Sequence, residues 1–203
     1  MTDHETPIDS EAARHLVSLA MATDDEPLYV VAIGAPTNIT SAILLEPKII
    51  ERIVVVWLGG QPLSYPTARE FNLKQDIPSV QVLLDCGVPL VLVPCMGVAS
   101  HLLTTVAELE KFVSGKGAIG DYLVEIFKAY SDNHFAWSKE VWDISTIGYL
   151  LNPDWVPSQI VHTPILTDQV TWSVDQRRHF MRIATHVRRN PIFADLFEKL
   201  NNL

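Results

Sequence analysis

The sequence predicts an α/β fold in which helices cover both faces of a doubly wound, mainly parallel sheet. Two observations lead to this prediction. Short apolar runs rich in β-branched residues occupy 28–33, 53–57 and 88–93, and helix-like segments separate them. Because each run is apolar at consecutive positions, it is typical of a strand buried on both faces of a parallel sheet. The 203 residues contain no repeat or linker, so we expect a single domain over residues 1–203.

Local signals place the element boundaries in the first half of the chain. Asp9 can cap a first helix, Pro78 suits the first turn of a later helix, and Gly87 can end that helix. The expected elements are, in order, a helix to Ala22, the strand at 28–33, a turn at 34–38, a helix at 39–45, the strand at 53–57, a helix from Pro78 to Asp85 and the strand at 88–93.

Beyond Pro94 the pattern changes from buried strands to helices and short strands. The short strands are expected to be antiparallel and to lie at an edge of the sheet, and Asn190 is expected to cap the closing helix. The expected helices are 102–113, 121–131, 141–151 and 191–200, and the expected strands are 160–161, 170–172 and 179–186.

Composition excludes several classes of function. A formal net charge of −9 and the lack of a basic run argue against a nucleic-acid backbone binder. No apolar run approaches the ~18–20 residues of a membrane span, and the polar segment 1–9 does not resemble a signal peptide. Cys86 and Cys95 lack a metal-type spacing, so we expect two reduced, buried thiols in a cytoplasmic protein.

The segment from Trp57 to Asn72 is the strongest candidate for a binding site. In doubly wound sheets, ligands bind beyond the carboxyl ends of the strands, and this segment follows one of them. If the segment is extended, Glu70 and Asn72 point to the same side and Phe71 is an anchor facing the other way. A carboxylate beside an amide suits the vicinal diol of a ribose. The alternative is that both are ordinary polar residues capping a loop.

This segment resembles the sugar-binding segment of the nucleoside hydrolases, calcium-dependent enzymes that cut the N-glycosidic bond of nucleosides. The turn at 34–38 resembles the Gly-x-x-Thr-Asn motif of the same family, and Asp76 also fits the family pattern. Taken alone, the turn could equally be an ordinary strand-to-helix connection. The resemblance covers nearly the whole chain and implies a Rossmann-like fold, a small-molecule nucleoside as the binding partner and bound calcium in the complete family fold.

For the sugar, the resemblance implies four residues. Glu70 and Asn72, with Phe71 between them, would bind the ribose. Ser64 stands where the family usually has an asparagine that contacts the sugar, and a hydroxyl is a shorter replacement.

For the base and the metal, the resemblance implies three more. Trp142 matches the residue that faces the base, which is tryptophan in the purine-specific branch. His134 lies in the preceding loop, which could form a rim for the base, and the alternative is that residues of this loop simply pack. Asp143 and the backbone carbonyl of Ile33 match calcium ligands. The alternative for Asp143 is a first-turn acid that favours the helix dipole. His101, His162, His179 and His186 have no spacing of a metal cluster.

One part of the family pattern has no counterpart. Complete nucleoside hydrolases begin with a strand that ends in an Asp-rich motif, which supplies calcium carboxylates and the general base, and this sequence contains no such motif. We therefore expect the N-terminal strands of the family fold to be absent. The general base would lie in that absent segment, so the catalytic residues cannot be named from this sequence. On this hypothesis the chain is a purine-leaning nucleoside hydrolase that is N-terminally incomplete and inactive alone. It is either truncated or completed by a separate N-terminal chain, and a homo-oligomer is the other partner considered.

Two alternatives stay open. The chain could be a non-catalytic nucleoside-binding or subunit-interaction module of the same family. It could also be an unrelated Rossmann-like domain, but no Gly-x-Gly-x-x-Gly follows the first strand, which argues against a dinucleotide.

Overall fold

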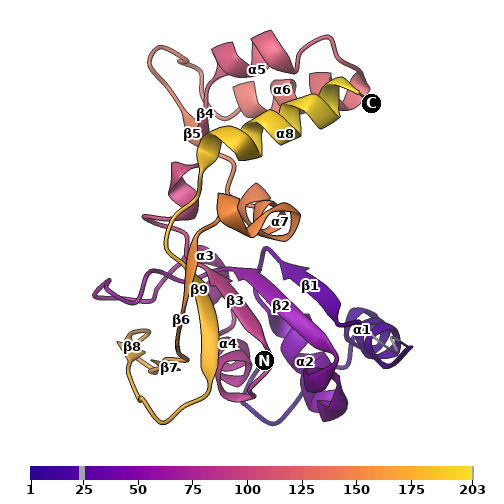
Figure 1. Cartoon of the computed structure of the whole chain (residues 1–203), viewed down its shortest axis with the longest axis vertical. Coiled ribbons are helices and arrows are strands. Elements are labelled where there is room, and N and C mark those ends of the chain that lie inside the picture. The colour runs from indigo at the N-terminus through magenta and orange to yellow at the C-terminus, as the bar shows by residue number, and fades with distance from the viewer. Residues whose placement is uncertain (23–25, 203) are drawn as a thin grey trace.

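A five-stranded sheet forms the base of the molecule (Figure 1). The computed structural model describes residues 1–22 and 26–202. The strand order is β1-β2-β3-β9-β6. The first four strands are parallel to their neighbours and β6 is antiparallel to β9, so the predicted mainly parallel sheet is confirmed. The bounds are β1 Leu28–Ala32, β2 Ile53–Leu58, β3 Leu90–Val93, β9 Phe180–Ala184 and β6 Ser158–His162.

Helices surround the sheet and extend above it (Figure 1). They are α1 Glu11–Ala22, α2 Thr37–Leu45, α3 Phe71–Lys74, α4 Ile77–Asp85, α5 Val106–Phe112, α6 Ala118–Lys128, α7 Ile144–Leu151 and α8 Arg189–Asn201, with 3-10 turns η1 Pro47–Glu51, η2 Ala99–His101 and η3 Pro153–Trp155. Two small antiparallel pairs join β4 Leu103–Thr104 to β5 Lys139–Glu140, and β7 Ile165–Leu166 to β8 Trp172–Ser173. Within residues 1–22 and 26–202, no helix is long and apolar enough to cross a membrane.

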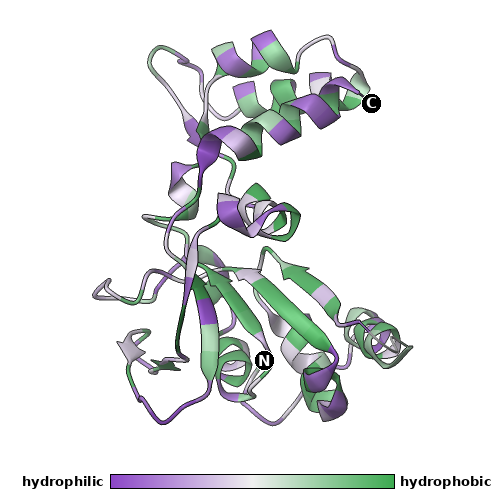
Figure 2. Ribbon diagram, in the orientation of Figure 1, coloured by the Kyte–Doolittle hydropathy of each residue, from purple (hydrophilic) through white to green (hydrophobic). Residues whose placement is uncertain are grey.

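The two faces of the sheet carry separate hydrophobic cores. Along β2, Ile53, Val55 and Trp57 point into the core formed with α1, α2 and α4. Val56 and Leu58 point the other way, into a core that includes residues of α5, α6 and α8. This alternation follows from the two-residue period of a strand. It explains why the run is apolar at every position, and Figure 2 shows the hydrophobic residues concentrated on these strands.

Several predicted boundaries are wrong for local reasons. Ser10, not Asp9, caps α1, because its Oγ accepts the N–H of Ala13 while Asp9 pairs with Arg14. The helix predicted at 102–113 begins only at Val106, after the short strand β4. The side chain of Asn190 caps nothing, since α8 begins one residue earlier.

The last strands also differ from the prediction. β9 is parallel to β3 and lies inside the sheet, so only β6 is the antiparallel edge strand. At the other edge lies β1, which was predicted to be buried on both faces. Instead every residue of β1 is at least partly exposed, and Tyr29 is 52% exposed.

Arg178 ties the start of β9 to α4. Its Nε donates to the carbonyl of Thr163 at 2.9 Å, and its Nη2 donates to the carbonyl of Leu84 at 2.7 Å and to Asp85. Hydrogen bonds from a charged donor are stronger than neutral ones. This one side chain therefore joins three segments that are distant in the sequence.

Replacing Arg178 with alanine is expected to lower the free energy of unfolding by about 1.5–3 kcal/mol, because two carbonyls lose a charged donor. Urea denaturation measures the change. The matched control is Arg177→Ala, since Arg177 is exposed and pairs only with Asp175 within the same turn. That variant should stay within about 0.5 kcal/mol of the parent. Equal losses of unfolding free energy in the two variants would contradict the role of Arg178 in joining these segments.

His179 is expected to make stability depend on pH. Burial and the neighbouring Arg178 lower the pKa of this imidazole below its ordinary 6.5. Between the two values the unfolded chain binds more protons than the folded one, so the free energy of unfolding rises with pH. The parent should therefore lose more stability than His179→Gln between about pH 7.5 and about pH 5.5. Urea titrations check this, with the exposed His15→Gln as the control that keeps the parental slope.

Candidate functional site

The candidate site is a cavity of about 710 Å³ at the carboxyl ends of β1, β2 and β3. This is the end of a parallel sheet where ligands are expected. Six of the eight sequence-predicted site residues line it. The lining residues are Ile33, Leu58, Gln61, Glu70, Phe71, Asn72, Cys95, Met96, Tyr130, Lys139, Trp142 and Asp143.

Glu70 is the anchor of the loop that follows β2. Its carboxylate accepts three backbone N–H groups, from Gly60 at 2.9 Å, Asn72 at 2.9 Å and Leu73 at 3.1 Å. Two of these belong to the first turn of α3, so Glu70 is the N-cap of that short helix. The third lies at the end of β2. One side chain therefore closes the whole loop from 60 to 70.

The expected extended geometry around Glu70 is wrong. Residues 71–74 form α3, so Glu70 and Asn72 are not presented as neighbours along a strand. Asn72 is buried, and its Nδ2 donates to the carbonyl of Leu58 at 2.9 Å, which leaves the amide oxygen as its remaining acceptor. Phe71 is no anchor on the far side, because it is 67% exposed and lines the same cavity.

The Gly59-Gly60 pair lets β2 turn sharply under the cavity. A Cβ on Gly59 would lie 2.2 Å from the ring of Trp57, and Gly60 has a φ of +65°. Trp57 is fully buried and donates from Nε1 to the carbonyl of Gly34, at the end of β1. The turn thus holds the ends of β1 and β2 in a fixed relation, which positions Ile33 and Leu58 at the cavity.

Trp142 and Asp143 enter the cavity from the segment just before α7. Asp143 is the N-terminal boundary residue of α7 and makes no capping hydrogen bond, so its carboxylate oxygens are not used by the helix backbone, although its position still favours the helix dipole. Trp142 is half-buried, packed against the second core while lining the cavity. Partial withdrawal of water raises the pKa of the Asp143 carboxyl above its ordinary value, although the residue as a whole is exposed.

Cys95 was not predicted as a site residue. It is buried in the cavity wall, where its thiol is close enough to Glu70 to be affected by the charge of that carboxylate. Burial first, and then the charge of Glu70, raise the pKa of this thiol, so it stays protonated and can act as a donor. Its place two residues after β3 was the available signal, because the loops after the strands were the expected site. Both cysteines are free thiols, but Cys86 is only half-buried.

The helical region contributes further unpredicted residues. Lys139 of β5 lies over the ring of Tyr130, with its Nζ 4.0 Å from the ring centroid. Both line the cavity, and Lys139 is its cationic side chain. Sequence spacing gave no signal for them, because the long segment 94–138 brings them back to the sheet only in the folded chain.

Two predicted site residues lie elsewhere. Ser64 is exposed and lines a different cavity, beside Gly97 and Thr185. His134 is exposed, and its Nε2 hydrogen-bonds to the carbonyl of Lys128 at 3.0 Å. Their expected contacts with a sugar and a base are therefore not supported by the arrangement of the side chains.

The residues at the cavity do not make up a calcium site by themselves. Calcium takes ~6–8 oxygen ligands. Asp143 and Ile33 do face the same cavity, but across residues 1–22 and 26–202 no three His, Cys, Asp or Glu side chains are grouped as metal ligands.

Comparison with known proteins identifies one family. The profile of the inosine-uridine preferring nucleoside hydrolases matches residues 2–194. The pyrimidine-specific ribonucleoside hydrolase RihB of Escherichia coli O139:H28 is 25% identical over 163 residues, which is 77% of this chain and 51% of the relative. A counterpart in Shigella boydii serotype 4 is 25% identical, with 77% of this chain and 66% of the relative covered. The chain thus spans about half to two-thirds of the length of these curated relatives.

Solved structures share the fold. The inosine-uridine preferring nucleoside hydrolase of Bacillus anthracis superimposes with a TM-score of 0.76 at 17% identity, covering 96% of this chain and 66% of the relative. An inosine-guanosine nucleoside hydrolase gives a TM-score of 0.78 at 17% identity, covering 95% of this chain and 68% of the relative.

Replacing Glu70 with alanine should lower the free energy of unfolding by about 1–3 kcal/mol, since three N–H groups lose their acceptor. Glu70→Gln keeps one side-chain oxygen and should fall between the parent and the alanine variant. Urea denaturation measures both. Arg69→Ala, at the exposed neighbouring position, is the control and should remain within about 0.5 kcal/mol of the parent. If Glu70→Ala were as stable as the parent, the anchoring role of Glu70 would be contradicted.

Proposed function

The chain belongs to the inosine-uridine preferring nucleoside hydrolase family, and on that premise we propose that its cavity binds a ribonucleoside whose N-glycosidic bond is to be hydrolysed. One observation carries the proposal. Residues from four separate segments, Ile33, Glu70 with Asn72, Cys95, and Trp142 with Asp143, meet at one cavity at the carboxyl ends of the parallel strands. Its volume of about 710 Å³ suits a small molecule.

The ribose is proposed to lie over Asn72 and Asp143. The Asn72 amide oxygen and the Asp143 carboxylate are acceptors for sugar hydroxyls. Glu70 is less available than we expected, because a carboxylate offers about four acceptor positions and three backbone N–H groups already use three of them. Its proposed contribution is to hold Asn72 and to keep negative charge beneath the sugar.

The base is proposed to lie against aromatic side chains. Trp142, Phe71 and Tyr130 all line the cavity and offer flat faces on which a base can stack. A purine has the larger ring system, so this arrangement favours a purine preference. Among the relatives, the curated ones are named for pyrimidine nucleosides and one solved structure for inosine and guanosine, so the family includes both specificities.

Hydrolysis requires more than binding. As the base departs, positive charge develops on the sugar, and the carboxylates of Asp143 and Glu70 can stabilise it electrostatically. A base must also take a proton from the attacking water. Asp143 is the cavity carboxylate without a backbone partner. We propose that this chain supplies binding and charge, and that the water-activating carboxylates come from outside it.

The second candidate is a non-catalytic nucleoside-binding module. The observation that favours it is the use of Glu70 as a helix cap, which removes one carboxylate from chemistry. The two functions separate cleanly, because a binding module retains nucleoside affinity under every condition without producing ribose.

Calorimetry with inosine and with uridine tests binding. Trp142→Ala should weaken inosine binding by about 5- to 150-fold, because stacking on a base is worth roughly 1–3 kcal/mol. The matched control is Trp137→Ala, since Trp137 packs on Phe127 and does not line the cavity. Inosine affinity equal to the parent in Trp142→Ala would contradict the proposed base position.

A hydrolysis assay with calcium present separates the two functions. The chain alone is expected to release no base from inosine, guanosine or uridine. Turnover by the chain alone, abolished in Asp143→Asn, would show that no outside carboxylate is needed.

A further inference from the structure

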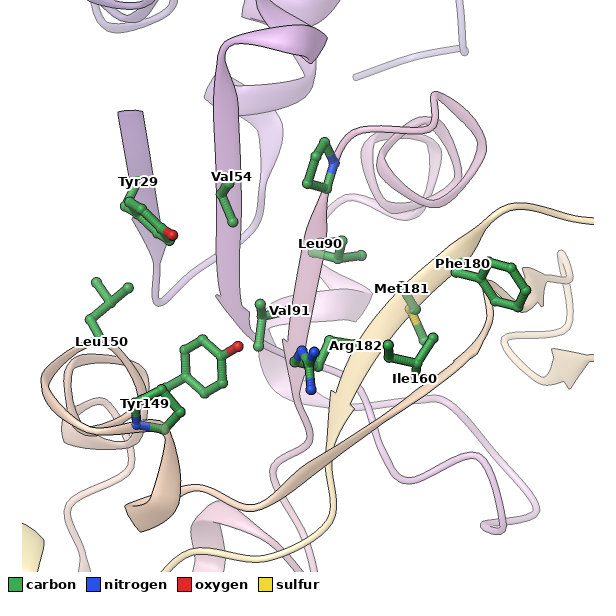
Figure 3. Close-up of a pocket in the computed structure, with 12 residues that line it drawn as sticks. Tyr29, Val54, Leu90, Val91, Tyr149, Leu150, Ile160, Phe180, Met181 and Arg182 are labelled. Carbon is green, nitrogen blue, oxygen red and sulfur yellow. The ribbon is translucent and has the colours of Figure 1, made fainter. Parts of the chain in front are cut away.

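A second cavity, a groove of about 690 Å³, lies on the sheet away from the candidate site (Figure 3). It lies on the amino-terminal half of the face that carries the second core. Its walls are mostly apolar, and part of them is exposed. Ile160 is 62% exposed and Phe180 is 61% exposed, and both belong to strands of the main sheet.

The strand register shows why this groove is unusual. Tyr29 pairs with Val54, and Val91 pairs with Arg182, which in turn pairs with Ile160. The groove is lined by residues of all five strands, mostly apolar, with Arg182 as the charged one. On the carboxyl half of the same face, Val56 and Leu58 are covered by the second core. Parallel sheets are normally covered on both faces, but on the amino half of this face Tyr149 and Leu150 of α7 border an open groove.

The edge of the sheet beside the groove is also unprotected. β1 has the sequence Leu-Tyr-Val-Val-Ala, apolar on both faces, which is typical of an internal strand. It carries none of the lysines, prolines or bulges that normally protect an edge. Its outer side has no strand partner among the strands that the structure describes.

Arg182 indicates that a ligand of this groove carries a negative charge. Its guanidinium points into the groove near Tyr149 and Ile160 (Figure 3). Nη1 donates to Ser158 Oγ at 3.3 Å, and none of the ion pairs found among residues 1–22 and 26–202 includes Arg182. A half-buried cation in an apolar groove is complemented by a carboxylate.

We propose that the groove and the β1 edge bind one strand–helix segment of a second polypeptide. The strand pairs parallel to β1, and the helix lays its apolar face on the groove with a carboxylate opposite Arg182. The fold comparison indicates the nature of this segment. Nearly all of this chain accounts for only 66% and 68% of two solved relatives, so about a third of each relative has no counterpart here.

Docking would also extend the candidate site. A strand parallel to β1 ends beside Ile33, which follows β1 and lines the site cavity. Residues after the added strand would therefore reach that cavity. This last step rests on the proposed function, whereas the docking itself rests on the groove and the edge.

The test is co-expression of the 203-residue chain with the part of the inosine-guanosine nucleoside hydrolase that the fold match leaves uncovered. Size-exclusion chromatography with light scattering is expected to show a one-to-one complex. Hydrogen exchange is expected to show new protection of the β1 amides. Tyr29→Glu and, separately, Arg182→Glu should weaken the complex by about ten-fold or more.

The matched control is Tyr122→Glu, on α6 and away from the groove, where the side chain is 59% exposed. Circular dichroism checks that each variant is folded. If Arg182→Glu does not fold, the test rests on the complex formed by Tyr29→Glu. The absence of a complex, a complex unaffected by Tyr29→Glu, or self-association of the chain through this face would each overturn the proposal. A complex that binds but does not hydrolyse inosine would leave docking standing and count against the proposed function.

Discussion

The carboxylate of Glu70 is the interaction on which the candidate site depends. It accepts N–H groups from the end of β2 and from the first turn of α3. Cys95, from the loop after β3, donates its backbone N–H to the carbonyl of Gly60 at 3.0 Å, so the two loops are joined directly. A loop closed by its own backbone groups costs little further ordering when a ligand arrives. The cavity is therefore largely formed before any nucleoside binds.

The two carboxylates at the cavity, Glu70 and Asp143, therefore have different roles. Glu70 is surrounded by donors and holds the backbone in place. Asp143 has no capping bond, and partial burial raises its pKa, so it is the carboxylate whose charge is less stabilised by the protein. A charge that the protein leaves under-stabilised is one that a sugar hydroxyl or a developing cation can stabilise. The chemistry of the site is therefore expected to centre on Asp143, with Glu70 as its support.

The sequence predicted the parallel sheet because buried strands leave a direct signal, as in the unbroken run from Ile53 to Leu58. It also predicted most of the cavity, since Ile33, Glu70 and Trp142 follow recognisable motifs at element ends. It did not predict α3, because four residues are too few to show a helical period. Lys139 and Tyr130 were missed for another reason: their position depends on how a long helical segment folds back, which local pattern cannot show.

The burial of β1 was also mispredicted, and here the failure is informative. The apolar pattern of β1 is that of an internal strand, yet the structure places it at an edge. The sequence pattern of a strand and its position in the sheet normally agree in a folded domain. Where they disagree, as they do at β1, a further interaction is expected to contribute. The two cores do not need that contribution, because each is already closed by its own helices. β1 and the groove beside it therefore lie outside the two cores as a partly exposed surface. A segment that paired with β1 would cover this surface at one end of the strand and reach the candidate site at the other.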